Sequence, residues 1–280
     1  MPAEDDERDL LDESSIGLRA ELRPGGRLNE REVPVEVADY PRFRRLTFYS
    51  VLAGLCPLLP VPFLDDWALE RIQRRMVREL GESRDLDLSD AEVRVLAGEG
   101  EKRLWPGFLK GTALAVRSGA RRVLRKVFRT AFYVLLMRDG VHRAVETFVQ
   151  GYLFLYASRL PQGLRPAGRT PERVRAVRAA VVETMLEEDV KPIHRAMGRA
   201  FQRSFDLLVK AAGRLGAVFG RLRAGERADE GEALREEEEL LGGFVDNVAA
   251  ALWGNEEYFE RLEKSFEERL RRKDTRTNTD

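Results

Sequence analysis

The chain has 280 residues, and its 48 basic and 48 acidic side chains leave no net charge at neutral pH. Apolar residues make up 43% of it, enough for a sizeable core, while charged residues reach 34%, above the average of about 25%. A balanced charge argues against a dedicated nucleic-acid binder, which is usually basic overall. Abundant charge at ordinary hydrophobicity is typical of amphipathic helices with wide solvated faces.

The single cysteine and the kind of basic residue used bear on the compartment. Cys56 lies in an apolar run, where a free thiol behaves as a small buried hydrophobe, and a chain without disulfides fits a reducing compartment. Only seven of the 48 basic residues are lysine, which is typical of a GC-rich bacterial genome. The polar, acidic opening over residues 1–15 predicts neither a signal peptide nor a transit peptide. We expect a cytoplasmic protein or, as the alternative, one on the cytoplasmic face of a membrane.

Residues 1–38 are predicted to form a disordered acidic segment. Seven acidic residues fall between Glu4 and Glu13, Pro24-Gly25-Gly26 breaks any helix, and few large apolar residues follow. From Pro41 onward the apolar residues recur at helical spacing. A single helical domain is therefore expected over 39–272, followed by a polar, disordered tail at 273–280.

The first half of this domain is divided by prolines and helix caps. An apolar helix is expected to end near Leu55, and Asp65 is expected to cap the next one. The pattern Ser89-Asp90-Ala91-Glu92 predicts a capping box for a short helix. A long helix should follow the turn at 105–107, with Asp139-Gly140 as a candidate interruption.

The second half begins after a loop at 161–170, which is also a candidate sub-boundary of the domain. Thr170-Pro171 predicts a helix start, and this helix is expected to kink at Pro192 and to continue to about Leu222. An acidic linker is predicted over 224–239, ahead of two last helices. Together these elements predict an all-α multi-helix bundle or helical array with a long Pro-kinked helix and disordered termini.

Searches for chemical motifs give one weak candidate. The sequence has no phosphate-binding glycine loop and no nucleophile elbow, and its only histidines are His142 and His194. Asp139, His142 and Glu146 share one helical face, and carboxylates beside an imidazole can bind a metal or relay a proton. We favour a structural role for His142, and we predict no catalytic residue, no cofactor and no metal site.

The uncharged run 47–64 approaches the roughly 20 residues that span a bilayer. Its second half holds three prolines, whose neighbouring carbonyls could not be satisfied in lipid. We therefore predict that this run lies in the core, with Leu55 and Phe63 largely buried, and we keep membrane contact as the alternative.

A basic helix is expected over 110–138, because ten basic residues and no acid fall between Glu101 and Asp139. Its charge could be neutralised by the acidic segments Asp5–Glu13 or Glu236–Glu239, or it could attract anionic lipid or nucleic acid. We favour an open row, because ordering flexible acidic segments costs entropy. The candidate anion- or lipid-binding residues are Arg117, Arg121, Arg122, Arg125, Lys126 and Arg129.

These observations favour a non-catalytic helical interaction or scaffolding protein with a protein partner. The alternative is a peripheral membrane protein that uses the run 47–64 and the basic helix 110–138 on an anionic surface. An enzyme and a nucleic-acid binder are less favoured, and homo-oligomerisation is left open.

Overall fold

The computed structural model describes residues 39–60, 64–100, 129–161, 163–165, 169–226 and 229–277, with the backbone alone at 129–134 and 274–277. This part of the chain forms nine α-helices, one short 3-10 helix and no strand, so the predicted all-α class is confirmed. The acidic segment 1–38 lies outside it. In chain order the elements are α1 (Tyr40–Leu55), η2 (Cys56–Leu58), α2 (Leu64–Glu82), α3 (Asp90–Ala97), α6 (Arg129–Arg159), α7 (Pro171–Glu187), α8 (Lys191–Arg203), α9 (Phe205–Arg223), α10 (Glu230–Trp253) and α11 (Glu256–Thr277).

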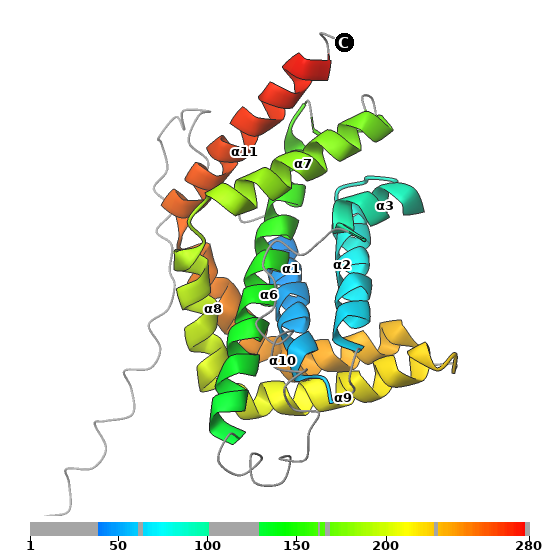
Figure 1. Cartoon of the computed structure of the whole chain (residues 1–280), viewed down its shortest axis with the longest axis vertical. Coiled ribbons are helices and arrows are strands. Elements are labelled where there is room, and N and C mark those ends of the chain that lie inside the picture. The colour runs from blue at the N-terminus through cyan, green and yellow to red at the C-terminus, as the bar shows by residue number, and fades with distance from the viewer. Residues whose placement is uncertain are drawn as a thin grey trace, which may run out of the picture. The chain divides into compact units, whose positions relative to one another are not determined.

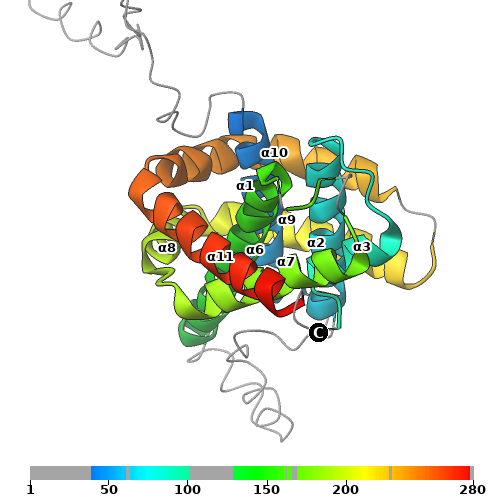
Figure 2. The same cartoon turned by 90° about the horizontal axis from the view of Figure 1, so that it is seen from above.

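Helices α1 and α6 pack against each other at the centre of this array (Figure 1). Helix α2 flanks them on one side and α8 on the other, an arrangement that Figure 2 shows from above. Helices α9 and α10 pack together at one end of the central pair, and α7 packs against α11 at the other. The central pair thus has neighbours on several sides, as a hydrophobic α1 requires.

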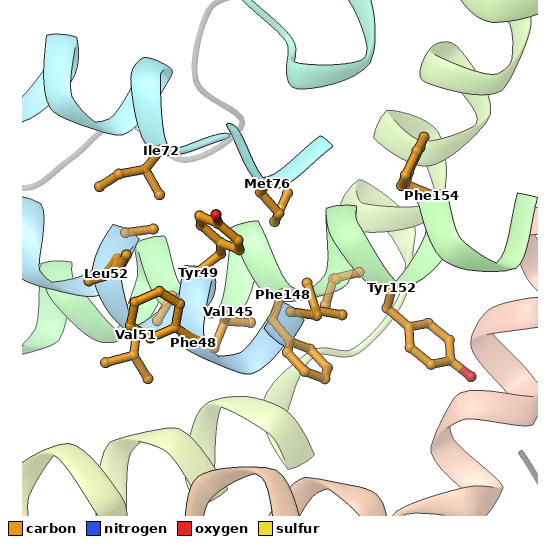
Figure 3. Close-up of a cluster of buried hydrophobic side chains, with 14 of the residues drawn as sticks. Phe48, Tyr49, Val51, Leu52, Ile72, Met76, Val145, Phe148, Tyr152 and Phe154 are labelled. Atoms are coloured by element: carbon orange, nitrogen blue, oxygen red, sulfur yellow. The ribbon is translucent and has the colours of Figure 1, made fainter. Parts of the chain in front are cut away.

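The first part of the uncharged run lies in the core, as predicted, whereas Pro57 to Leu59 are half-buried and Pro60 is exposed. Every residue from Thr47 to Cys56 is buried, Leu55 fully so, whereas Phe63 lies outside the described residues. Figure 3 shows Tyr49 of α1 gathered with Met76 of α2 and Phe148 of α6. No helix among the described residues is long and apolar enough to cross a bilayer. The residues from Thr47 to Cys56 are therefore packed inside the helical array.

Gly140 does not interrupt α6, which is continuous from Arg129 to Arg159. It is instead the point where α1 and α6 come closest. A Cβ on Gly140 would lie 2.5 Å from the carbonyl oxygen of Gly54, and a Cβ on Gly54 would lie 2.9 Å from the carbonyl oxygen of Gly140. The two glycines therefore let the two backbones touch, a contact that any side chain would prevent.

The stretch expected as one Pro-kinked helix is divided into three helices. Helix α7 ends at Glu187, α8 begins at Lys191, and Ser204 separates α8 from α9. Pro192 occupies the first turn of α8, where its missing N–H leaves no intrahelical bond unmade. The proline therefore starts a helix at this place and does not kink one.

The predicted acidic linker over 224–239 is wrong for its second part, because α10 begins at Glu230. Asp229 caps this helix by accepting bonds from the N–H groups of Gly231 and Glu232. Leu234 and Leu241 are buried on its inner face, so the run of glutamates belongs to an amphipathic helix. Acidic residues in the first turn are also favoured by the helix dipole.

Two further boundaries differ from the sequence prediction. Helix α11 runs to Thr277 and so takes in the start of the predicted tail at 273–280. Helix α2 begins at Leu64, which places Asp65 within its first turn and not at the cap position. The carboxylate of Asp65 turns to a different partner, which is described below.

Candidate functional site

Helix α8 is held in place by a fully buried inner face. Ile193, Met197 and Phe201 recur every four residues and have no exposed surface. The ring of Phe201 meets that of Phe244 on α10 with centroids 5.8 Å apart, and it fills the space beside Gly54 on α1. Because α8 is fixed in this way against three other helices, the direction of its outer face is fixed too.

The outer face of α8 carries four basic residues at successive steps of four: Lys191, Arg195, Arg199 and Arg203, which we call the α8 basic row. All four are exposed. Lys191 lies 3.4 Å from Asp189, whose pKa is lowered chiefly by the backbone N–H of Lys191 and less by the charge of Arg195. Within the part of the chain that the structure describes, Arg199 and Arg203 have no ion pair or hydrogen bond.

Two arginines of α1, a helix of the central pair, behave differently. Arg44 of α1 bridges Glu238 and Asp246 of α10, with N–O distances of 2.9 and 2.6 Å. Arg45 of α1 pairs with Glu79 of α2 at 2.7 Å. The positive charge of Arg44 and Arg45 is therefore matched by carboxylates of adjacent helices. The charge of the α8 basic row is not matched by carboxylates of adjacent helices in the described part of the chain.

The sequence carries a signal for this face that our motif search did not use. Only one acid, Asp206, falls between Val190 and Glu226. One of the basic residues of this stretch, Arg214, is paired with Glu236 and Glu237 of α10. This stretch therefore has a surplus of basic residues, nearly as large as that of the acid-free stretch before Asp139. Its basic residues are Lys191, Arg195, Arg199, Arg203, Lys210, Arg214, Arg221 and Arg223.

The only two histidines of the chain meet at the contact between α6 and α8. The ring centroids of His142 and His194 are 4.6 Å apart with the ring planes inclined by 50°. Partial burial lowers the pKa of both rings, and the nearby charge of Arg138 lowers both pKa values further, while Asp139 opposes this at His142. Neutral imidazoles at physiological pH let the two helices pack closely.

The three residues considered for a metal site are not brought together. Asp139 is buried and lies 3.5 Å from Arg143, His142 faces His194, and Glu146 is half-buried. Among the described residues, no three histidine, cysteine or carboxylate side chains are placed to hold a metal ion. In this structure Asp139 is therefore an ion-pair partner of Arg143, and His142 packs against His194.

Arg143 forms the most buried ion-pair cluster of α6. Its side chain is 6% exposed and lies 2.9 Å from Asp65, 3.7 Å from Asp66 and 3.5 Å from Asp139. Since Asp65 and Asp66 belong to the first turn of α2, the cluster ties the start of α2 to the middle of α6. The sequence prediction of Asp65 as a helix cap missed this partner.

The arginine row proposed from the sequence, Arg117 to Arg129, lies outside the residues whose side chains the structure describes. The acidic run considered as its internal partner is described, and it is helical. Glu236 and Glu237 pair with Arg214 of α9, and Glu238 pairs with Arg44 of α1. Three of the four carboxylates of that run therefore already have basic partners.

Comparison with protein-family models, with curated proteins and with solved structures gives no match.

Proposed function

We propose that this chain is a non-catalytic binding protein that docks on an anionic partner through the α8 basic row. The observation that carries the proposal is an exposed row of four basic residues on a firmly held helix, in a chain of zero net charge. Within the described residues Lys191 is paired with Asp189, whereas Arg199 and Arg203 have no carboxylate partner. Like charges one turn apart destabilise a helix by roughly 0.2–0.5 kcal/mol per pair. A partner that supplies negative charge removes this repulsion and is attracted over a distance of about a Debye length.

The polar groups in the interior support a binding role over a catalytic one. Arg143 is engaged with three carboxylates, and the His142 ring packs against that of His194. These groups join one helix to another, as scaffold residues do. The thiol of Cys56, which is buried and forms no disulfide, also supports a reducing compartment such as the cytoplasm.

A retention experiment on immobilised heparin tests the proposal with a simple polyanion. The salt needed for elution is measured for the full chain and for the variant R195Q/R199Q/R203Q. We expect the variant to elute at clearly lower salt, because three charges that face the polyanion are lost.

The matched control is R175Q/R271Q/R272Q, which removes the same net charge from three exposed arginines that have glutamate partners. Its elution should stay close to that of the unchanged protein. Equal losses in the two variants would show that net charge alone governs retention, and the proposal would be abandoned.

A further inference from the structure

We infer that the anionic partner is the headgroup surface of a lipid bilayer, an inference that rests on the proposed function. Exposed aliphatic side chains precede and follow the α8 basic row in the chain. A peripheral membrane helix needs both components, since basic groups attract anionic headgroups and apolar groups enter the boundary of the acyl chains.

The large hydrophobic side chains that are exposed in the described part of the chain are Leu186, at 57%, and Val209, at 39%. Leu186 precedes Lys191 by five residues, and Val209 follows Arg203 by six. Both therefore flank α8, one in the last turn of α7 and the other in the second turn of α9. No other helix in the described residues is bordered in this way.

The end of α7, all of α8 and the start of α9 follow one another along one side of the helical array (Figures 1 and 2). The α8 basic row extends for about 18 Å at the rise of an α-helix. A row of this length can meet several headgroups at once if α8 lies along the bilayer surface. Leu186 and Val209 are the exposed aliphatic residues that precede and follow this stretch in the chain.

A nucleic acid or an acidic peptide fits these features less well. Single-stranded nucleic acids are bound by basic grooves with aromatic side chains on which bases stack, whereas the large apolar side chains exposed among the described residues are aliphatic. An acidic peptide would match the charge, but it would leave no role for Leu186 and Val209. The lipid surface is the partner that uses both kinds of side chain.

The first experiment measures co-sedimentation of the full chain with vesicles of phosphatidylcholine containing about 30% phosphatidylserine, and with vesicles of phosphatidylcholine alone. Each basic residue near an anionic leaflet strengthens binding about five-fold, so R195Q/R199Q/R203Q should bind the anionic vesicles roughly 100-fold more weakly. The control R175Q/R271Q/R272Q should bind nearly as well as the unchanged protein. Replacing the two aliphatic residues, in L186S/V209S, should weaken binding by about five-fold or more.

The second experiment asks whether an aliphatic position enters the lipid. The L186C variant is labelled with a fluorophore sensitive to polarity, and native Cys56, at 1% exposure, is shielded from the reagent. We expect a blue shift with anionic vesicles and none with heparin. The same label on R272C of α11 should not shift with either.

The outcomes separate this inference from the proposed function. Row-dependent retention on heparin without row-dependent binding to anionic vesicles would overturn the lipid inference and leave the proposed function standing. Vesicle binding without a shift at L186C, or tighter row-dependent binding to duplex DNA than to vesicles, would also overturn it. If neither heparin nor vesicles respond to the row, both proposals fail.

Discussion

The arginines of α1, a helix of the central pair, and those of α8, a helix that flanks this pair, have different surroundings. Arg44 and Arg45 lie against α10 and α2, whose glutamates and aspartate meet them. Arg199 and Arg203 have no such neighbour in the described part of the chain. Both helices carry arginines, so the difference between them comes from the helices that lie next to each one. Charge paired within the fold stabilises it, and charge left open is available to a partner.

The largest effect should come from removing a buried, paired arginine. Arg143→Met leaves Asp65 and Asp139 without their cation, and uncompensated buried charge is costly. We expect the free energy of unfolding in urea to fall by about 3 kcal/mol. The double variant D139N/R143M should recover part of this loss. A change below about 0.5 kcal/mol would show that the cluster does not hold α2 to α6.

A smaller loss is expected from a partly exposed arginine that is paired. Arg44→Met breaks two contacts with α10, but its side chain is 29% exposed and solvent weakens both. Unfolding by urea should become easier by about 1 kcal/mol. The difference in stability between the variant and the unchanged protein should shrink in high salt, because salt screens the two ion pairs of Arg44 in the unchanged protein.

The α8 basic row should behave in the opposite sense. R199Q removes like-charge repulsion one turn away on each side, so stability should stay unchanged or rise by about 0.3 kcal/mol. The urea midpoint measured without any polyanion tests this. A clear loss of stability would mean that Arg199 has a structural partner. The contrast between the paired arginines of α1 and the open arginines of α8 would then no longer hold.

The smallest effect concerns pH and the histidine pair. The folded pKa values of His142 and His194 lie below the unfolded value of about 6.5, so the unfolded chain binds more protons as the pH falls. Stability should therefore decrease from about pH 7.5 to about pH 5.5, and the decrease should be modest because both rings are half-buried. H194Q should flatten this dependence relative to the unchanged protein. An identical pH profile for the two would refute it.

Local signals in the sequence predicted local structure well. The capping box at Ser89 and Glu92 and the helix start at Thr170-Pro171 are both confirmed. The burial of the run from Thr47 to Cys56 also followed from its lack of charge. These features depend on a few neighbouring residues, so spacing and residue type suffice to predict them.

Features that depend on contacts between distant helices could not be predicted in this way. Gly140 reads as a helix breaker until Gly54 is placed opposite it. His142 and His194 stand 52 positions apart, and only the packing of α8 on α6 brings their rings together. The four-residue spacing of the α8 basic row can be read from the sequence. Its exposure, and the lack of partners at Arg199 and Arg203 among the described residues, depend on where the neighbouring helices lie.

The most direct test of the α8 basic row uses the unchanged protein and the chemistry of arginine itself. Modification by phenylglyoxal is followed by mass spectrometry at Arg195, Arg199 and Arg203, with and without a saturating polyanion. We predict strong protection of these three side chains and none at Arg175, Arg271 and Arg272, which are also exposed. Protection spread evenly over both groups, or absent from α8, would contradict the account.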